Sequence, residues 1–503
     1  MTRTFKHGLH ILLIIMMLSG YNTTMTCQEA GDVISNNNID LTLRDAIELA
    51  IRNSPDAMMA KHRFRNSYWQ YVYYKASYKP QLMITGSPIQ FQNQQKLIET
   101  VDGSYYSRYK QLYSDLRILL YQEIGFSGGH FSLFSDIGYT KNFFDGNSFV
   151  SASPINISIT QPVFGYNAYK WEKKIEPLRY LEAKQQYVET LEDIAITTTT
   201  FFFNSLISQI DKEIQETNLS NHDTLLSIAK GRYKMGSIAE NEVLNMELNY
   251  LTSLSQLEKA NLDFENQIFH LKSYLRLPED ANIRLIPPTE IPDLIVDAKQ
   301  AVEEANENRA DIISYKRQLL EAEQMLDKAK KSRNSFDLSL TFGLDKTGNT
   351  FAEAYKKPQN KEVAMLSIRV PIMDWGKTRG QIKMSESAME LTKTTVEQSI
   401  IDFDREIYIK AKEFNIQKSQ LTIAAKSDTV AQKRYDFTKS RYLIGTIDIT
   451  ELNSASTDKD VKQQGYYMAL QNFWIKYFEI RKLTLFDFER QEKLSSNFDV
   501  LVK

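Results

Sequence analysis

The chain has 503 residues and nearly balanced charge, with 61 Lys and Arg against 63 Asp and Glu and a net charge of −2. This balance lacks the basic excess of a nucleic-acid-binding surface, so no nucleic-acid partner is expected. The single cysteine excludes a disulfide framework, and the six histidines never occur at metal-ligand spacing. No Ser/His/Asp, Cys/His or phosphate-binding Gly pattern is present either, so we expect no enzyme, no metal and no cofactor.

Residues 1–27 have the order of a secretory signal peptide, because Arg3 and Lys6 precede an apolar run that is too short for a membrane span. Cys27 is either the acylated first residue of a lipoprotein or a cysteine beside an ordinary cleavage point. The preceding Thr-Met-Thr fits a lipoprotein box poorly, which favours the second interpretation. A polar linker over 28–40 follows.

The first predicted helix covers about 42–79. Thr42 and Asp45 have the spacing of a capping box with Asp in place of Glu, and a break is expected at Pro55. A short strand follows near 82–86.

A long insert over 87–153 separates this strand from the next. Its Tyr- and Gly-rich segments predict one more hairpin, with a Ser-Gly-Gly turn at 127–129 between strands near 116–126 and 131–139. The insert is either an extracellular cap or a source of extra strands.

Three later segments, near 154–162, 336–344 and 363–371, alternate apolar and polar residues. Such alternation is typical of membrane β-barrel strands, with one face toward lipid and the other toward the lumen. A half-buried antiparallel sheet of a soluble protein would give the same pattern. The residues expected to face lipid are Ile155, Ile157, Ile159, Phe336, Leu338, Leu340, Phe342, Leu366 and Ile368.

Two helices of about 65 residues are predicted over 166–230 and 375–440, each roughly 97 Å long at 1.5 Å per residue. Shorter helices are expected over 239–277, 298–333 and 448–490. Apolar residues at core spacing within them are Leu244, Leu248 and Leu251, and Leu470, Trp474 and Tyr477. Helices near 100 Å far exceed what a globular core needs and indicate a tube or a spacer.

Two unrelated motifs recur at an offset of 209 residues. Arg232–Ile238 resembles Arg441–Ile447, and Pro162 corresponds to Pro371 in a second pair. The chain is therefore a duplication, with repeats at 41–280 and 298–490, a linker at 281–297 and a tail at 491–503. Two repeats supply four secure strands, fewer than the roughly eight of the smallest filled barrel, so several chains must share one barrel.

The motifs resemble those of the TolC-type outer-membrane efflux and secretion channels. The residues that carry the resemblance are Leu41-Thr42-Leu43-Arg44-Asp45-Ala46, Asn53-Ser54-Pro55, Asn308-Arg309-Ala310-Asp311-Ile312, Pro371-Ile372-Met373-Asp374-Trp375-Gly376 and both Arg-Tyr-x-x-Gly turns. The resemblance implies a mainly α fold with membrane β structure. It implies a homotrimer whose 12-stranded outer-membrane barrel, four strands per chain, continues into a long periplasmic α-helical barrel.

The resemblance also implies functional residues and partners. The turns would be periplasmic tips that dock an adaptor (membrane-fusion) protein, through Arg232, Tyr233, Gly236, Arg441, Tyr442 and Gly445. Family members close the tunnel with acids six and nine residues after the turn glycine, where this chain has Glu242 and Glu451 at the first position but Asn245 and Ser454 at the second. Solvated helix-face glutamates would look the same.

The function implied is a passive exit duct in the outer membrane of a Gram-negative-type bacterium, extending into the periplasm. An inner-membrane transporter of the RND, ABC or MFS type would supply the energy, and outer-membrane lipid would surround the barrel. The alternative is a non-channel, periplasm-spanning helical scaffold or adhesin. The alternating strands in both repeats favour the duct.

Overall fold

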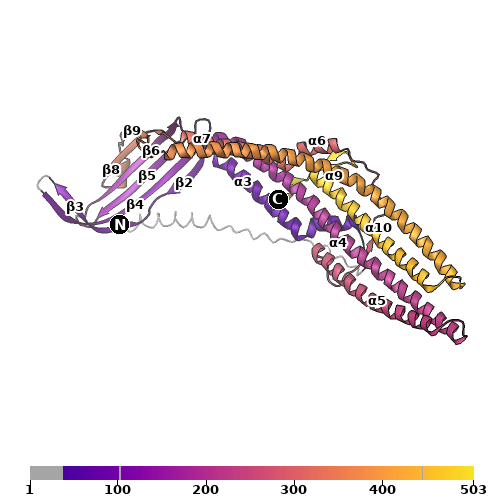
Figure 1. Ribbon diagram of the computed structural model, residues 1–503. Coiled ribbons are helices and arrows are strands. Elements are labelled where there is room, and N and C mark those ends of the chain that lie inside the picture. Colours follow the sequence, from indigo (N-terminus) through magenta and orange to yellow (C-terminus); the bar gives the residue numbers. More distant parts are fainter. Residues whose placement is uncertain (1–37, 101–102, 145, 445, 503) are drawn as a thin grey trace. The chain divides into compact units, whose positions relative to one another are not determined.

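The computed structural model describes residues 38–100, 103–144, 146–444 and 446–502, so the expected signal peptide and Cys27 lie outside the described residues. Contacts divide the chain into two units. Among the described residues, the smaller holds 38–40 and 280–284, where β1 (Asn38–Thr42) pairs with β7 (Asn282–Ile286). The larger unit, Leu41–Glu279 with Leu285–Lys503, contains the long helices and the main sheet (Figure 1).

The first helical region is broken where the sequence predicts. Helix α2 (Leu43–Asn53) begins with the predicted capping box, in which the Thr42 hydroxyl accepts from Asp45 N at 3.2 Å and the Asp45 carboxylate accepts from Thr42 N at 3.3 Å. Ser54 ends α2 and caps α3 (Pro55–Ser77). The proline suits the first helical position because its missing N–H has no partner there in any case.

The single helix expected over 298–333 is a pair, and this expectation is corrected. Helix α6 (Ala298–Asn308) and helix α7 (Ala310–Lys331) meet at Arg309, whose backbone is extended. The Arg309 side chain donates to Lys482 O at 3.0 Å and lies 3.4 Å from the Glu189 carboxylate. These contacts stabilise the break between α6 and α7. The equivalent break in the first repeat, between α2 and α3, is produced by Pro55.

The main sheet contains seven strands, and the four expected ones are among them. The insert supplies three more. Two of them, β4 and β5, confirm the hairpin predicted around 127–129, and β3 was not expected, so the expectation of four strands for this sheet is corrected. Hydrogen-bonded neighbours follow the order β2-β4-β5-β6-β8-β9, with β3 paired to β4, and every pairing is antiparallel. The bounds are β2 Gln81–Thr85, β3 Gln90–Thr100, β4 Gly103–Ile124, β5 Gly129–Asn142, β6 Ser148–Val163, β8 Ser335–Gly348 and β9 Gln359–Arg369.

The two long helices are equal in length and related by the repeat offset. Helices α4 (Ala168–Lys234) and α9 (Lys377–Leu443) have 67 residues each, and both ends differ by 209 (377 − 168 and 443 − 234). The returning helices α5 (Glu240–Leu275) and α10 (Ile449–Thr484) have 36 residues each and the same offset. Within the described ranges, no helix is both long enough and apolar enough to cross a membrane.

The C-terminal end differs from the expectation. Helix α10 ends at Thr484 rather than near 490, because Leu485 adopts a left-handed conformation with φ 49°. A short hairpin of β10 (Phe486–Asp487) and β11 (Glu492–Lys493) follows, and then α11 (Phe498–Val502). Helix α11 is held against α3, since the Phe498 and Phe64 rings are 5.3 Å apart.

Buried ion pairs join the two repeats. The Arg481 guanidinium donates to both carboxylate oxygens of Glu192 at 3.1 Å and to Asp487 at 2.7 Å. Burial raises the pKa of Glu192, and Arg481 opposes that shift. Because a bidentate arginine satisfies both carboxylate oxygens, α10 is held in a defined register on α4. A second pair joins Arg317 of α7 to Glu182 of α4, at 2.6 Å.

The apolar stripe on α5 is exposed, whereas that on α10 is buried. Leu470 and Tyr477 lie in the core, as expected. Leu244, Leu248 and Leu251 are more than half exposed, so the expectation that they pack in a core is wrong for the single chain. Helical spacing identifies an apolar face but does not identify what covers it.

Candidate functional site

The turn between α4 and α5 is closed by main-chain hydrogen bonds. Gly236 N donates to Tyr233 O, and Ser237 N donates to Arg232 O, both at 2.9 Å. Gly236 has φ +73°, a conformation that side chains with a Cβ adopt reluctantly. No atom lies within 4 Å of the place where a Cβ would stand, so the backbone conformation, not crowding, requires this glycine.

The turn between α9 and α10 repeats this arrangement in the part that is described. Thr446 N donates to Arg441 O at 3.1 Å, and Gly445 lies outside the described residues. The Asp448 carboxylate then caps α10 by accepting from Glu451 N at 2.9 Å.

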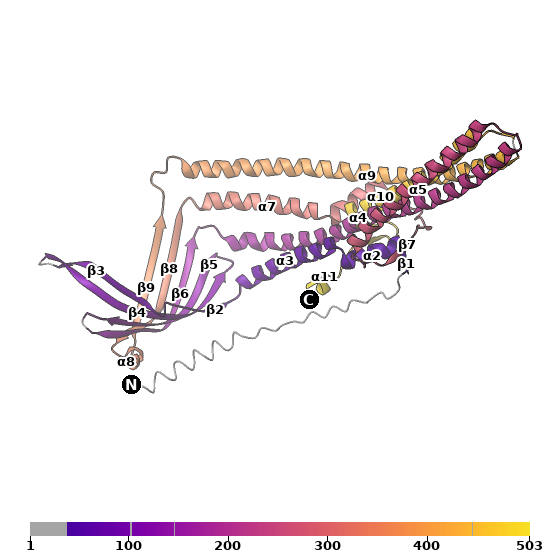
Figure 2. The same ribbon diagram turned by 90° about the horizontal axis from the view of Figure 1, so that it is seen from below.

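The structure brings the two turns together, as the ends of the α4–α5 and α9–α10 hairpins show in Figures 1 and 2. Arg232 Nη2 donates to Leu443 O at 3.1 Å, and its guanidinium lies 6.0 Å from the centre of the Tyr442 ring. Burial raises the pKa of Tyr442, while Arg232 lowers it and Glu242 raises it further. A shared apolar cluster lies behind these contacts, formed by Leu225, Leu226, Ala229, Met246, Tyr435, Leu452 and Ala455.

The two copies of the motif use their side chains in opposite ways. Arg232 is half-buried and Tyr233 is exposed, whereas Arg441 is exposed and Tyr442 is half-buried. The exposed surface of the tip, which we call the tip surface, therefore combines Tyr233 and Arg441 with the exposed apolar residues Met235, Leu443 and Ile444.

The two candidate gate residues are exposed and lie just after the turns, Glu242 on α5 and Glu451 on α10. Two polar contacts that the sequence did not predict join the α4–α5 hairpin to the α9–α10 hairpin near these residues. Asn218 Nδ2 donates to Asp460 at 2.8 Å, and Lys439 Nζ donates to Asn221 at 3.0 Å. No sequence signal marks these pairs, because each is an ordinary polar residue whose partner is more than 200 positions away.

The expected lipid-facing residues fall on one face of the sheet. Ile157 pairs with Phe342, Ile159 with Leu340, Val163 with Phe336, Phe336 with Ile368, and Leu338 with Leu366. Ile155, Ile157, Ile159, Phe342, Leu366 and Ile368 are exposed, and Phe336, Leu338 and Leu340 are half-buried. The opposite face is polar, with hydroxyl contacts between Ser158 and Thr341 at 2.9 Å and between Thr160 and Ser339 at 3.3 Å.

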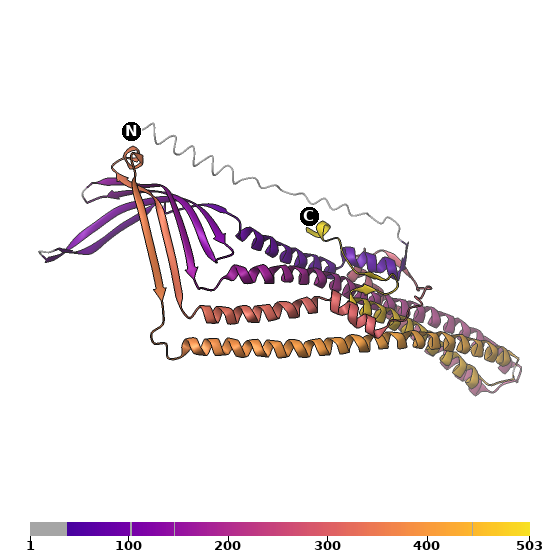
Figure 3. The same cartoon turned by 90° about the horizontal axis from the view of Figure 1, so that it is seen from above.

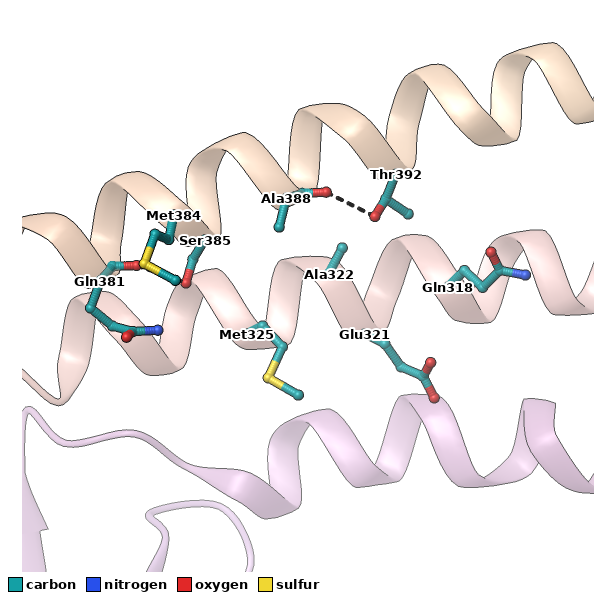
Figure 4. Close-up of a pocket in the computed structure, with 9 residues that line it drawn as sticks. All are labelled: Gln318, Glu321, Ala322, Met325, Gln381, Met384, Ser385, Ala388 and Thr392. Carbon is teal, nitrogen blue, oxygen red and sulfur yellow. Dashed lines mark hydrogen bonds between the residues drawn. The ribbon is translucent and has the colours of Figure 1, made fainter.

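A groove of about 500 Å³ lies between α7 and α9 (Figure 4). Its lining is mostly Met, Ala and Gln, and its single carboxylate, Glu321, already pairs with Arg179 and Arg317. The groove therefore brings together no acid, base or nucleophile for catalysis. Among the described residues, no group of three or more His, Cys, Asp or Glu could hold a metal ion.

Comparisons with known proteins agree with this architecture. Residues 335–484 match the outer membrane efflux protein family. The CmeC outer membrane channel of Campylobacter jejuni is 13% identical and has a TM-score of 0.65, with 92% of this chain and 89% of that chain covered. The outer membrane protein VceC of Vibrio cholerae is 12% identical with a TM-score of 0.61, and the match covers 90% of this chain and 97% of that chain. The MtrE outer membrane channel of Neisseria gonorrhoeae is 10% identical with a TM-score of 0.57, and the match covers 90% of this chain and 91% of that chain.

No curated protein sequence matches the chain. The fold is that of the TolC-type outer-membrane channels, which confirms the resemblance that the motifs predicted. The match to the outer membrane efflux protein family lies within the second repeat. That family consists of channels and is not a class of enzymes.

The asymmetry of the tip leads to a prediction. Arg232→Ala removes the hydrogen bond to Leu443 O and the contact with Tyr442, and should weaken the closed tip by about 1 kcal/mol. Hydrogen exchange of peptides covering 232–238 and 441–448 should become several-fold faster. Arg441→Ala is the matched control and should leave exchange unchanged, because that side chain is exposed. Equal acceleration by both variants would contradict the assigned roles.

Proposed function

We propose that three copies of this chain form the outer-membrane exit duct of a tripartite efflux or type I secretion system. The duct conducts substrates passively from the periplasm to the exterior. Its tips dock a periplasmic adaptor protein, and an inner-membrane transporter of the RND, ABC or MFS type supplies the energy.

The observation that carries this proposal is the apolar face of the main sheet, which is uncovered except where helix α8 (Phe351–Tyr355) packs on Val150 and Ala152. In a soluble protein such a face is packed against other elements, yet Ile155, Ile157 and Ile159 are each at least 40% exposed. A hydrocarbon environment covers an apolar face without any partner element. The polar opposite face, with Ser158 and Thr341 in contact, suits a water-filled lumen.

The edges of the sheet support assembly into a closed barrel. Among the residues that the structure describes, strands β2 and β3 at one side and β9 at the other have no hydrogen-bonded neighbour beyond them. Unpaired N–H and C=O groups cannot remain in lipid, so other copies must pair with them.

A stripe on α9 supports the same assembly in the helical part. Five exposed apolar residues recur at intervals of seven: Ile409, Ile416, Ile423, Val430 and Phe437. A seven-residue apolar period is the seam of a coiled coil and needs a facing helix. With the exposed leucines of α5, it gives each copy two apolar stripes that neighbouring copies can cover.

The alternative of a helical scaffold or adhesin is tested by membrane fractionation. The duct predicts that the protein is in the outer-membrane fraction as trimers that resist detergent and dissociate on heating. A protein found only in the soluble periplasmic fraction would contradict the duct and favour the scaffold.

The gate assignment predicts a change in ion conductance. Glu242 and Glu451 from three copies place six carboxylates near one constriction, where like charges bind cations. In planar bilayers, the double variant Glu242→Gln, Glu451→Gln should raise single-channel conductance or weaken block by divalent cations. Glu240→Gln is the control, since that side chain is exposed on the same helix but two residues away from Glu242. Unchanged conductance and block in the double variant would remove the gate role.

The docking assignment predicts site-specific crosslinking. In cells, Tyr233→Cys and Arg441→Cys with a thiol crosslinker should trap a periplasmic adaptor protein, identified by mass spectrometry. Tyr442→Cys should trap less because its side chain is half-buried. Arg44→Cys controls for collision, as that side chain is 82% exposed and lies on α2. Equal yields from Arg44→Cys would exclude the tip as the docking surface.

A further inference from the structure

The insert contributes strands to the interior of the main sheet rather than a separate layer over it. Strand β5 lies between β4 and β6, and β4 pairs with β2 on its other side (Figures 2 and 3). The strands that the repeats predict are therefore not all neighbours, because β4 and β5 separate β2 from β6.

The insert strands continue the two-faced pattern of the repeat strands. From β2 to β8, one register row of the sheet is apolar: Leu82, Leu120, Leu133, Ile157 and Phe342. The adjacent row, on the opposite face, is polar over the same strands: Gln81, Tyr121, Ser132, Ser158 and Thr341. On β9 the pattern ends, because the two rows continue to Glu362 and Val363. The rows pass through β4 and β5 without interruption.

Most other contacts of the insert follow the same division. On the polar face, Arg117 Nη2 donates to Asp136 at 3.2 Å, and the Tyr121 ring lies 5.3 Å from that of His130. The apolar pair on this face is Leu119 with Phe134, whose ring lies under the Arg117 guanidinium. On the apolar face, Leu116 and Ile118 are more than 40% exposed and add to the uncovered surface. A cap over the barrel mouth would have water on both sides and no reason for such a division.

The paired strands are also long enough to cross a membrane. Residues 111–124 of β4 pair with 129–142 of β5, which is 14 residues on each strand. A tilted membrane strand needs about 9–11 residues.

We infer that β4 and β5 are part of the membrane wall, so that each copy contributes six strand positions and three copies close an 18-stranded barrel. β2 and β3 occupy one position, because both pair with the same side of β4. The partner of each sheet edge is a second copy of this chain, with β9 of one copy beside β2 of the next. The inference rests on the proposed duct and concerns the size and composition of its wall.

The directions of the strands allow this closure. Along the order β2-β4-β5-β6-β8-β9 every neighbour is antiparallel, so the first and sixth positions run in opposite directions. When β9 meets β2 of the next copy, the junction is therefore antiparallel as well. Three copies give an even number of strands, the usual condition for bacterial outer-membrane barrels.

An 18-stranded barrel has a wider exit than a 12-stranded one. At a strand spacing of about 4.8 Å and a tilt of about 40°, 12 strands enclose a backbone diameter of about 24 Å and 18 strands about 36 Å. Barrels of 16–18 strands in porins hold an aqueous channel. The outer-membrane end would thus be a wide mouth, and the narrowest point would lie in the helical part.

Cysteine labelling of reconstituted trimers tests the inference. Two matched pairs of single substitutions are compared with a charged, membrane-impermeant maleimide: Leu120→Cys with Tyr121→Cys on β4, and Ile157→Cys with Ser158→Cys on β6. The parent protein without an added cysteine measures the background. We expect Tyr121→Cys and Ser158→Cys to react at least tenfold faster than their partners.

The two pairs separate failure of this inference from failure of the duct. If Ile157→Cys is protected but Leu120→Cys reacts as fast as Tyr121→Cys, the duct stands and the insert is a cap, which overturns the inference. If neither pair differs, the sheet does not lie in lipid and both proposals fail. Electron microscopy of the unmodified trimer gives an independent count, for which 18 strands support the inference and 12 overturn it.

Discussion

The need to satisfy every backbone hydrogen bond inside lipid is the constraint from which the assembly follows. A sheet that exposes one apolar face is stable in a membrane only if its edges are also paired, because water is absent to solvate N–H and C=O groups. The single chain has the apolar face but leaves β2, β3 and β9 as open edges. In the proposed duct the single chain is thus incomplete by itself, and other copies must pair with these edges.

The internal duplication determines the geometry of the helical part. The long helices α4 and α9 have the same length and the same offset, so their turns lie at equal distances of about 100 Å from the helix starts beside the sheet. The tips are nevertheless not equivalent. Arg232 is used to join the hairpins, and Arg441 is left on the surface. One copy of the motif stabilises the tip, and the other is free to contact a partner.

Sequence reasoning succeeded where the signal was periodic or local. The capping box of Thr42, the break at Pro55 and the alternating strands of the repeats depend on residues close together in the chain, and the repeat offset depends on motifs that recur at a fixed spacing. It failed where the partner was distant. The break at Arg309 depends on Lys482 and Glu189, and the contact of Asn218 with Asp460 spans 242 residues. The insert was predicted only in part. Strand β3 was missed because its many glutamines weaken the apolar/polar alternation that identifies a strand.

The central claim is that the apolar face of the main sheet lies in lipid, and fluorescence quenching by brominated lipids tests it most directly. Ile157→Trp and Ser158→Trp place the probe on opposite faces at neighbouring positions, and the signal of the four native tryptophans is subtracted with the parent protein. In vesicles of brominated phosphatidylcholine, the added fluorescence of Ile157→Trp should be strongly quenched and that of Ser158→Trp should not. Equal quenching at both positions, or none at either, would contradict the account.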